Sequence, residues 1–312
     1  MGAHFIVGAG AVGTAAAEAL RNLGHEVTIG TRTGGGAERE GIRRVRVDAS
    51  DADELAAATA GVDALYNCAN PRYDRWADDW PPLASAMLEV ARRTGATLVT
   101  MSNLYGYGPV DHPMTTADPL AATFTNGKVR AAMWEAAKAA SDAGDARIAE
   151  VRASDFFGPG TGGTSHIGRA LPRVLAGKTA MVLGDPTQPH TWTFVPDVGR
   201  TLACVGTTPS AWGQAWHVPS NAPATQAAML ARAAMLAGVA PPKIRKIPNI
   251  AVAALGLVNG EVRALKDVAY QFDRPFIMDA GATTKALGLD PTPLDDALEA
   301  TIAAERAGEV PA

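Results

Sequence analysis

Three glycines near the start of the chain have the spacing of a dinucleotide-binding turn. They stand at positions 8, 10 and 13 of FIVGAGAVGTAAAEAL. In such a turn Gly8 permits the tight bend, Gly10 lets the backbone approach a pyrophosphate, and Gly13 allows a helix to pack closely on a strand. The phosphates bind to free N–H groups at the helix start, here Ala11 and Val12. Glycines that serve packing alone are the alternative interpretation.

The residues after the next apolar run, EVTIG, indicate which nucleotide is bound. An acidic residue there would bind a ribose 2′-hydroxyl, and a basic one would accommodate a 2′-phosphate. The sequence continues with Thr31 and Arg32 and offers no acid at this point. Because a guanidinium group matches the geometry of a phosphate, the sequence predicts NADP (NADPH) as the cofactor. The alternative is that Arg32 is an ordinary solvated loop cation.

The elements that must position this turn are a strand, a helix and a second strand. HFIVG, AVGTAAAEALRNLG and EVTIG form such a βαβ unit within about 30 residues. The alternation continues through RRVRVD, DADELAAATAG, DALYNCANP, PPLASAMLEVARRTG, ATLVTMS, GKVRAAMWEAAKAASDAG and ARIAEVRAS, with prolines expected at the start of the helix over 81–95. This pattern predicts an α/β fold with a doubly wound parallel sheet, the Rossmann fold.

Ligands in such sheets lie beyond the carboxyl ends of the strands. The residues that follow the predicted strands are therefore candidates for cofactor binding, together with the glycine turn and residues 31 and 32. They are Asp48, Cys68, Ala69, Asn70, Ala153 and Ser154.

After residue 157 the amino-acid composition changes, and proline, glycine and aromatic residues become frequent. TFVPDVGRTLACVG and AWHVP are typical of a helix and strand that return to the sheet, and the rest from about Ala224 is mainly helical. We therefore expect a dinucleotide-binding domain over 1–156, with 193–219 returning to it. Segments 157–192 and 220–312 form a smaller, mainly helical C-terminal substrate domain.

Composition limits the partners of this chain. It has 312 residues, a net charge of -4, and 28 basic against 32 acidic residues without a basic run, which disfavours nucleic acid. Two cysteines are too few for a disulfide scaffold, and no metal-ligand spacing stands out, so no metal is expected. No apolar run approaches a membrane span, and without a basic leader we expect a cytoplasmic protein.

The chain resembles the short-chain dehydrogenases/reductases of extended or atypical type, often labelled NAD-dependent epimerase/dehydratase. The resemblance covers nearly the whole chain and rests on motifs in a fixed order: GAGAVG, NLYGYG, VRASDFFGPG, LAGKTAMVLGDPTQPHTWTFVPDVGR and AWHVPSNAP. It implies that the first domain binds the dinucleotide. It also implies that the segments around 157–192 and beyond about 224 build the substrate pocket.

The resemblance further implies a catalytic Ser or Thr after the fifth strand, a Tyr, and a Lys four residues after the Tyr. The tyrosine passes a proton to or from the substrate oxygen, while the lysine lowers its pKa and binds the ribose. In TFTNGKVRAAMWE, Lys128 matches the lysine, but Phe124 stands in the place of the tyrosine. Lys128 as a surface cation is the alternative.

Other hydroxyl groups are candidates for the missing acid, because MSNLYGYG follows the fifth strand. Ser102 lies near the position of the family's Ser or Thr and could order a water or bind a carbonyl. Tyr105 matches a tyrosine that usually packs inside in the family. Tyr107 lies between glycines, and we expect it to point into the pocket.

Aromatic residues are expected to form the walls of the pocket, which suits a small apolar or aromatic substrate. A proton carrier and a structural histidine are both open interpretations for His190. The expected lining residues are Tyr73, Trp76, Tyr105, Phe156, Phe157, His190 and Trp192.

The sequence thus predicts an NADP(H)-dependent reductase, dehydrogenase or epimerase that acts on a hydroxyl, a carbonyl or a conjugated double bond. The alternative is a catalytically silent NADP(H)-sensing regulatory module, which the missing tyrosine suggests. The expected partner is a small-molecule substrate. The protein is expected to be a monomer, or a homodimer that pairs near 81–94 and 126–143, as family members often do.

Overall fold

The computed structural model describes residues 1–36 and 39–308 of the chain. Its larger part is a seven-stranded sheet in the order β11-β6-β5-β4-β1-β2-β3, with every pair of neighbours parallel. The strands are β1 (Ala3–Val7), β2 (Glu26–Thr31), β3 (Ile42–Arg46), β4 (Ala64–Asn67), β5 (Thr97–Asn103), β6 (Ile148–Ala153) and β11 (Ala215–His217). The predicted doubly wound Rossmann sheet is therefore confirmed.

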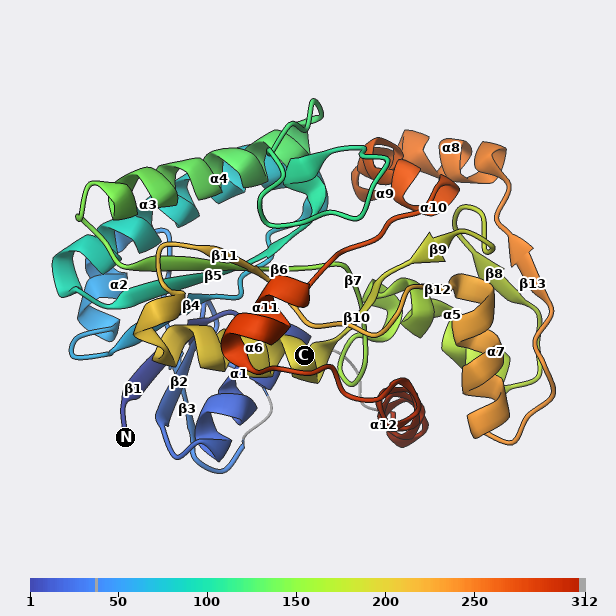
Figure 1. Cartoon of the computed structure of the whole chain (residues 1–312), viewed down its shortest axis with the longest axis horizontal. Coiled ribbons are helices and arrows are strands. Elements are labelled where there is room, and N and C mark those ends of the chain that lie inside the picture. The colour runs from blue at the N-terminus through green and yellow to red at the C-terminus, as the bar shows by residue number, and fades with distance from the viewer. Residues whose placement is uncertain (37–38, 309–312) are drawn as a thin grey trace.

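Helices cover both faces of this sheet (Figure 1). One face carries α2 (Ala52–Ala58), α3 (Trp76–Thr94) and α4 (Thr125–Asp142), and the other carries α1 (Ala11–Asn22) and α6 (Val195–Thr207). Successive side chains of a strand point to opposite faces. Phe5 therefore packs in one core with Met87 of α3, while Ile6 packs in the other with Leu20 and Leu202. Because both faces are buried, the central strands are continuous apolar runs.

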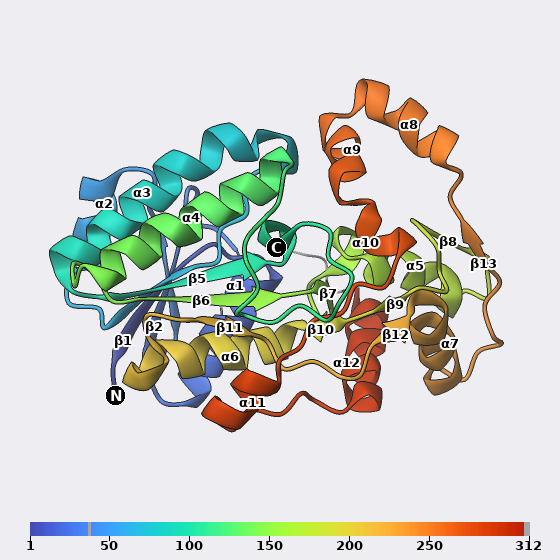
Figure 2. The ribbon, with the colours of Figure 1, turned by 45° about the horizontal axis from the view of Figure 1, so that its top comes forward.

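A second region lies beyond the carboxyl ends of the strands in both ribbon views (Figure 1, Figure 2). Its core joins α5, α7 and α12 through Leu171, Leu230 and Leu298. Its helices are α5 (His166–Leu175), α7 (Gln226–Leu236), α8 (Asn249–Val258), α9 (Gly260–Ala264), α10 (Tyr270–Asp273) and α12 (Leu294–Ala307). Its strands form three short ladders: β7 (Asp155–Phe157) with β10 (Trp192–Phe194), β8 (Ala180–Val182) with β13 (Ile244–Lys246), and β9 (Pro189–His190) with β12 (Ala224–Thr225).

Short 3-10 helices follow several strands. Two of them carry tyrosines: one begins six residues after the end of β4, and the other begins two residues after the end of β5. The set is η1 (Tyr73–Arg75), η2 (Tyr105–Tyr107), η3 (Gly162–Thr164), η4 (Pro209–Ala211) and η5 (Leu265–Val268).

The start of α3 differs from the sequence prediction. The helix begins at Trp76, so that Pro81 and Pro82 lie inside it. Trp76 and Trp80 are 3% and 0% exposed, and the burial of these two indoles holds the added turns in place. The carbonyls that the prolines leave without a helical partner belong to residues 77 and 78, which are exposed and can bind water. The predicted start at residue 81 is therefore wrong.

The segment over 220–312 does not lie wholly in the second region. Helix α11 (Gly281–Leu287) lies beside β11, and Leu287 packs against the core between the sheet and α1. The expected domain boundaries stay a prediction, and residues 309–312 of that segment lie outside the described residues.

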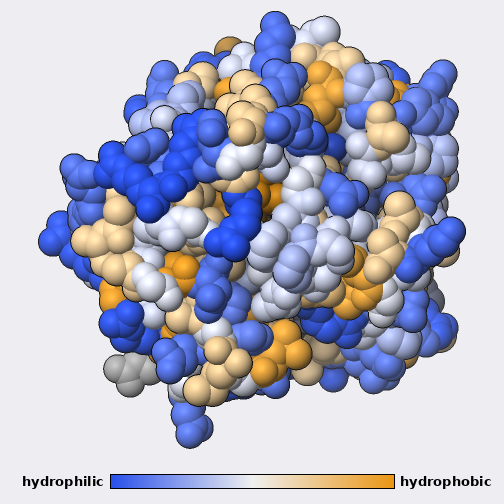
Figure 3. Space-filling view, turned by 60° about the vertical axis from the view of Figure 1, so that its left-hand side comes forward, coloured by the Kyte–Doolittle hydropathy of each residue, from blue (hydrophilic) through white to orange (hydrophobic). Residues whose placement is uncertain are grey.

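In the described ranges, no helix combines the length and the apolar character needed to cross a membrane. One face of the molecule is mostly hydrophilic, with its apolar side chains in small separate groups (Figure 3).

Candidate dinucleotide and substrate site

The glycine turn between β1 and α1 forms an open cradle. Gly8 has a φ of +107°, and a Cβ on it would lie 2.6 Å from the carbonyl oxygen of Cys68. A Cβ on Gly13 would lie 2.0 Å from the carbonyl oxygen of Gly8. At Gly10, by contrast, no atom lies within 4 Å of the position that a Cβ would take. The fold thus requires two of the glycines, and the third leaves room for a ligand.

The first turn of α1 faces this cradle with uncapped N–H groups. Gly10 is the N-cap residue and supplies no side-chain cap, and the first turn contains no acidic residue. Val12 packs against the core, and Ala11 lies against Gly160, whose Cβ would come within 3.4 Å of the Ala11 Cβ. Free N–H groups at the positive end of a helix bind phosphate. The cradle therefore fits the pyrophosphate of a dinucleotide. Gly160 belongs to the GPG of VRASDFFGPG, one of the motifs on which the family resemblance rests.

Two basic residues flank the end of β2. The Thr31 hydroxyl accepts a hydrogen bond of 2.9 Å from the Gly34 N–H and so shapes the glycine loop. Arg32 is exposed, and its carbonyl accepts a bond of 3.3 Å from Nε of Arg46. Hydrogen bonds from the hydroxyl and N–H of residue 50 lower the pKa of Asp48, and the charge of Arg32 adds to this shift. The guanidinium of Arg32 thus lies within the electrostatic reach of a carboxylate.

The residues after β4 and β6 lie at the same edge, because the strand order is β6-β5-β4-β1. The backbone of Cys68 closes against Gly8, and burial raises the pKa of its thiol to about 12, so the thiol stays protonated. Ala69 donates its N–H to the residue 67 side chain, and Asn70 is exposed. On the other side Ala153 is buried, and the Ser154 N–H donates to Oγ1 of residue 193 at 3.2 Å.

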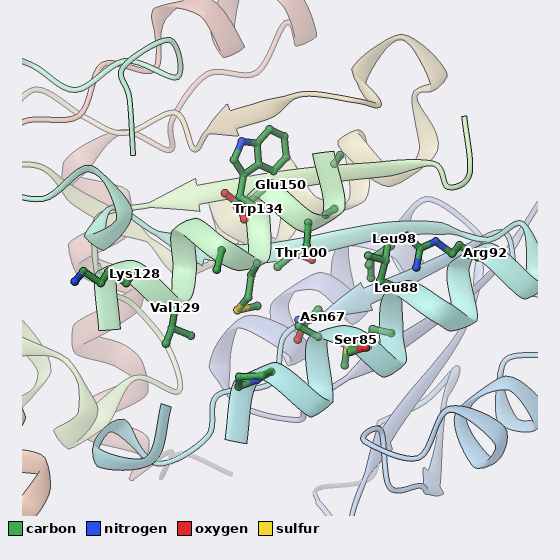
Figure 4. A pocket seen from close by; sticks show the side chains of 18 residues that line it. Asn67, Ser85, Leu88, Arg92, Leu98, Thr100, Lys128, Val129, Trp134 and Glu150 are labelled. Carbon is green, nitrogen blue, oxygen red and sulfur yellow. The ribbon is translucent and has the colours of Figure 1, made fainter. Parts of the chain in front are cut away.

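Lys128 stands in the first turn of α4, four residues after Phe124. Its N–H donates to the Phe124 carbonyl at 3.0 Å, and its side chain is exposed. It lines the mouth of a groove of about 550 Å³ between α3 and α4, and it points away from Thr100 and Glu150, which line the same groove (Figure 4). Ser102, on β5, is only 3% exposed. The structure leaves both assignments as predictions.

Tyr107 takes part in a buried polar network. Its hydroxyl accepts a hydrogen bond of 2.6 Å from Nη1 of Arg152 and donates to Nε2 of His217 at 2.7 Å. Nδ1 of His217 donates to the Asp279 carbonyl, and Nε of Arg152 pairs with Glu150 at 2.6 Å. Tyr107 is 2% exposed, and burial raises its pKa. We therefore correct the expectation that Tyr107 points into a pocket, because both hydrogen-bonding directions of its hydroxyl are satisfied inside the protein.

Five aromatic side chains gather beyond the ends of β4 and β5, and we call them the aromatic cluster: Tyr73, Trp76, Tyr105, Phe124 and Tyr270. The ring of Phe124 lies 6.3 Å from that of Tyr105 and 6.1 Å from that of Tyr270, between centroids. Burial raises the pKa of Tyr73 and of Tyr270 to about 12. Their hydroxyl oxygens are buried, and no described residue meets them in full hydrogen-bonding geometry. The side chains of Tyr105 and Asn126 lie near the Tyr73 hydroxyl, and that of Gln271 lies near the Tyr270 hydroxyl. Unpaired buried hydroxyls of this kind suit a polar group of a ligand.

A polar cluster adjoins these rings. Asp155 Oδ2 lies 2.9 Å from Nε2 of His190, and Asp155 Oδ1 lies 3.7 Å from Nε2 of His166. Nη2 of Arg169 donates to Nδ1 of His166 at 3.1 Å. Of these residues, only His190 is among the predicted pocket residues. Asp155 stands at a predicted strand end in VRASDFFGPG, where its carboxylate was a usable signal, but nothing in the sequence marked His166 or the distant Tyr270.

The remaining predicted pocket residues mostly belong to cores. Phe157 is fully buried against the ring of Phe194, at 5.4 Å between centroids. Trp192 is 4% exposed and donates its indole N–H to the Ala224 carbonyl at 2.8 Å. Phe156 is half-buried and packs against the core of the sheet. The structure therefore gives Phe157 and Trp192 a packing role.

An apolar cavity of about 280 Å³ opens under α8, next to the polar cluster. His166 and Arg169 are its polar members, so the cavity meets the cluster around Asp155. Its apolar lining consists of Met181, Val182, Leu183, Ile247, Ala251, Val252, Leu255 and Val262. In the described part of the chain, no group of three or more His, Cys, Asp or Glu side chains is placed to hold a metal ion.

A doubly wound sheet with a glycine cradle at its first βα turn defines the class of Rossmann-type dinucleotide-binding folds. The model of the NAD dependent epimerase/dehydratase family matches residues 5–218, and the chain belongs to this family. This confirms the resemblance that the motifs indicate. No curated protein sequence matches the chain.

Solved structures of similar fold cover nearly the whole chain. A dTDP-glucose 4,6-dehydratase from Bacillus anthracis in complex with NAD has a TM-score of 0.82 at 16% identity, over 99% of this chain and 98% of that one. A UDP-glucuronic acid 4-epimerase from Bacillus cereus, in complex with UDP-glucuronic acid and NAD, has a TM-score of 0.78 at 16% identity, over 98% of this chain and 99% of that one. An epimerase from Methanothermobacter thermautotrophicus has a TM-score of 0.80 at 18% identity, over 98% of this chain and 93% of that one. At these identities the similarity establishes the fold.

Proposed function

We propose that the protein is an NADP(H)-dependent oxidoreductase or epimerase/dehydratase-like enzyme. It acts on a carbonyl, a hydroxyl or a conjugated double bond of a small apolar or aromatic substrate. The observation that carries this proposal is the common location of the open cradle at Gly10, the aromatic cluster and Asp155 beyond the strand ends. When bound, the dinucleotide supplies or takes up the hydride, and the side chains orient the substrate.

The end of β2 supports NADP(H) over NAD(H). Arg32 is exposed, Nε of Arg46 donates to its backbone carbonyl, and residues 31–36 include no acid. A guanidinium forms charge-assisted hydrogen bonds with a 2′-phosphate, whereas the ribose 2′-hydroxyl of NAD is usually bound by an acid. Calorimetric titration with NADPH and NADH tests this choice. Tighter binding of NADPH supports it, and equal affinities would overturn it.

The lining of the site supports an apolar or aromatic substrate. Two of the dehydratase and epimerase neighbours act on sugar nucleotides by name, and such ligands require many polar contacts. Here the aromatic cluster and the apolar cavity under α8 are the apolar features beyond the strand ends on which this proposal rests. An apolar body fits these walls, and the hydroxyls of Tyr73 and Tyr270 remain for one polar group.

The test of activity is the loss of NADPH absorbance with a panel of aromatic aldehydes, ketones and enones. UDP-glucose and UDP-glucuronic acid are incubated with the protein and the oxidised dinucleotide, and their products are followed by NMR, because epimerisation and dehydration consume no net NADPH. Turnover of the aromatic compounds supports the proposal in full. Turnover of the UDP-sugars alone contradicts the substrate class and leaves the enzyme class intact.

A catalytically silent NADP(H)-sensing module is the second candidate, and Phe124 is the observation that favours it. A phenylalanine ring at this place has no proton to transfer, although Lys128 is retained. Tight NADPH binding without turnover of any compound on the panel would favour this function over the enzyme.

A further inference from the structure

The hydrogen bonds of His190 indicate that its side chain and that of Asp155 together hold two protons. Nδ1 of His190 lies 3.2 Å from the Gln271 carbonyl oxygen. A carbonyl only accepts, so Nδ1 carries a hydrogen. Nε2 lies 2.9 Å from Oδ2 of Asp155, and two bare lone pairs would repel each other at that distance. A second proton therefore lies between the ring and the carboxylate. An ionised Asp and a neutral His would hold only the one proton on Nδ1.

Neighbouring groups place this proton on the histidine side. Arg169 donates to Nδ1 of His166, so the Nε2–H of His166 faces Oδ1 of Asp155. Burial lowers the pKa of His166 to about 4, which keeps this ring neutral. Burial raises the pKa of Asp155, but the hydrogen bond from His190 and the positive charge of Arg169 act against burial, and that pKa is lowered overall. Asp155 is thus the carboxylate and His190 the proton carrier.

Of the two side chains, that of Asp155 is the more accessible. The His190 side chain is 2% exposed and is held between the rings of Trp192, at 4.3 Å, and Phe272, at 5.1 Å. The Asp155 side chain is 19% exposed. Besides the two histidines and Arg169, the titratable groups that face Asp155 are the tyrosines of the aromatic cluster. Burial raises the pKa of each tyrosine, and the negative charge of Asp155 raises it further. They are Tyr73, Tyr105 and Tyr270.

We propose that Asp155 and His190 exchange a proton with the substrate oxygen and so replace the hydroxyl that is absent at Phe124. Asp155 touches the substrate, and His190 is the positioning residue that carries the proton to it. This inference rests on the proposed function and narrows the substrate to compounds with a carbonyl or hydroxyl oxygen. It also accounts for an acidic residue at a strand end where the sequence analysis expects only cofactor contacts.

In the reduction direction the carbonyl carbon accepts the hydride of NADPH, and the π electrons of the C=O bond move to its oxygen. That oxygen takes the shared proton through Asp155, which leaves an ionised Asp155, a neutral His190, an alcohol and NADP⁺. Water returns the proton to the pair. The reverse sequence removes the proton from a hydroxyl during oxidation.

The first test observes the proton directly and needs no turnover. Long-range ¹H–¹⁵N spectra of the full chain with ¹⁵N-labelled histidine are recorded near neutral pH, with His190→Gln to assign the signals. We expect His190 to have both nitrogens protonated, and Asp155→Asn to convert it to a neutral ring with hydrogen on one nitrogen. A His190 spectrum that Asp155→Asn leaves unchanged would overturn the inference.

The second test measures NADPH oxidation with phenanthrenequinone, an aromatic diketone. We expect Asp155→Asn and His190→Gln each to lower kcat by about 10²- to 10⁴-fold, with NADPH affinity unchanged. The His190 spectrum of each variant, recorded as in the first test, separates the loss of the proton carrier from a merely structural effect. Asp111→Asn, at a side chain that is 99% exposed, is the matched control and keeps full activity.

The outcomes separate the two proposals. Full activity of both variants beside an active unmodified protein overturns the role of the pair and leaves the proposed function standing. The absence of turnover of every compound on the panel by the unmodified protein, together with an ordinary His190 spectrum, overturns both. Thermal unfolding of each variant identifies any loss of activity that comes from misfolding. If His190→Gln is destabilised, the activity of the isosteric Asp155→Asn decides whether the pair has the proposed role.

Discussion

Replacing the glycines of the cradle by alanine distinguishes the residue that the fold requires from the residue that the ligand requires. Gly13→Ala places a methyl group 2.0 Å from the carbonyl oxygen of Gly8, so α1 must move away from β1. Overpacking of this kind lowers the free energy of unfolding by about 1–3 kcal/mol. Gly10→Ala meets no atom within 4 Å and has a φ of -68°, which alanine adopts without strain. We expect it to change the free energy of unfolding by less than about 1 kcal/mol.

The effect on binding is expected to follow the opposite order. The methyl group of Gly10→Ala occupies the space in front of the free N–H groups of α1, where we place the pyrophosphate. NADPH affinity should fall at least about tenfold, about 1.4 kcal/mol. Urea unfolding followed by circular dichroism gives the stability, and calorimetry gives the affinity. Gly163→Ala is the matched control, because it also meets no atom within 4 Å but lies in η3. If Gly10→Ala binds NADPH as tightly as the unmodified protein, the cradle does not hold the phosphates.

Three further perturbations test the remaining assignments. Arg32→Ala removes a charge-assisted contact of about 1.5–3 kcal/mol, so NADPH affinity should fall about tenfold or more while NADH affinity stays unchanged in calorimetry; equal losses for both would contradict the role of Arg32. Tyr107→Phe deprives Arg152 and His217 of their partner, so urea unfolding should show a loss of about 1–3 kcal/mol with turnover retained, and a selective loss of turnover would restore Tyr107 as a catalytic candidate. Burial lowers the pKa of His217 to about 4, so the unfolded chain takes up a proton first as the pH falls below about 6.5. Stability that is present at neutral pH should then be lost toward pH 4, by up to about 3 kcal/mol for this group, and His217→Gln should flatten the profile.

The cradle could be found from the sequence because its parts are local. Gly8, Gly10 and Gly13 lie on one strand, one turn and one helix, and the periodicity of those elements is visible in the letters. The succession of strands and helices predicts the sheet for the same reason. The start of α3 was misplaced because the prolines are a local signal, whereas the burial of Trp76 and Trp80 depends on the packed structure.

The direction of each tyrosine was decided by tertiary packing. Tyr105 and Tyr107 stand on one short 3-10 helix, and the sequence treated them as neighbours at one strand end. The structure turns Tyr107 toward Arg152 and His217, while Tyr105 joins rings from residues 73 and 270. No periodicity encodes this choice, because it depends on which distant side chains can satisfy a buried hydroxyl.

The sequence by itself determined the strand-turn-helix that can hold a dinucleotide and a basic residue at the end of β2, and it predicted that Phe124 stands where the resemblance implies a tyrosine. Only the tertiary structure decided which groups meet there. Asp155 and His190 are 35 residues apart and come into contact where β7 pairs with β10, next to β9. Hydrophobic patterning specifies elements through short-range repeats, but a contact between two polar side chains depends on the folding of whole segments against each other, and their chemistry exists only after that packing has excluded water.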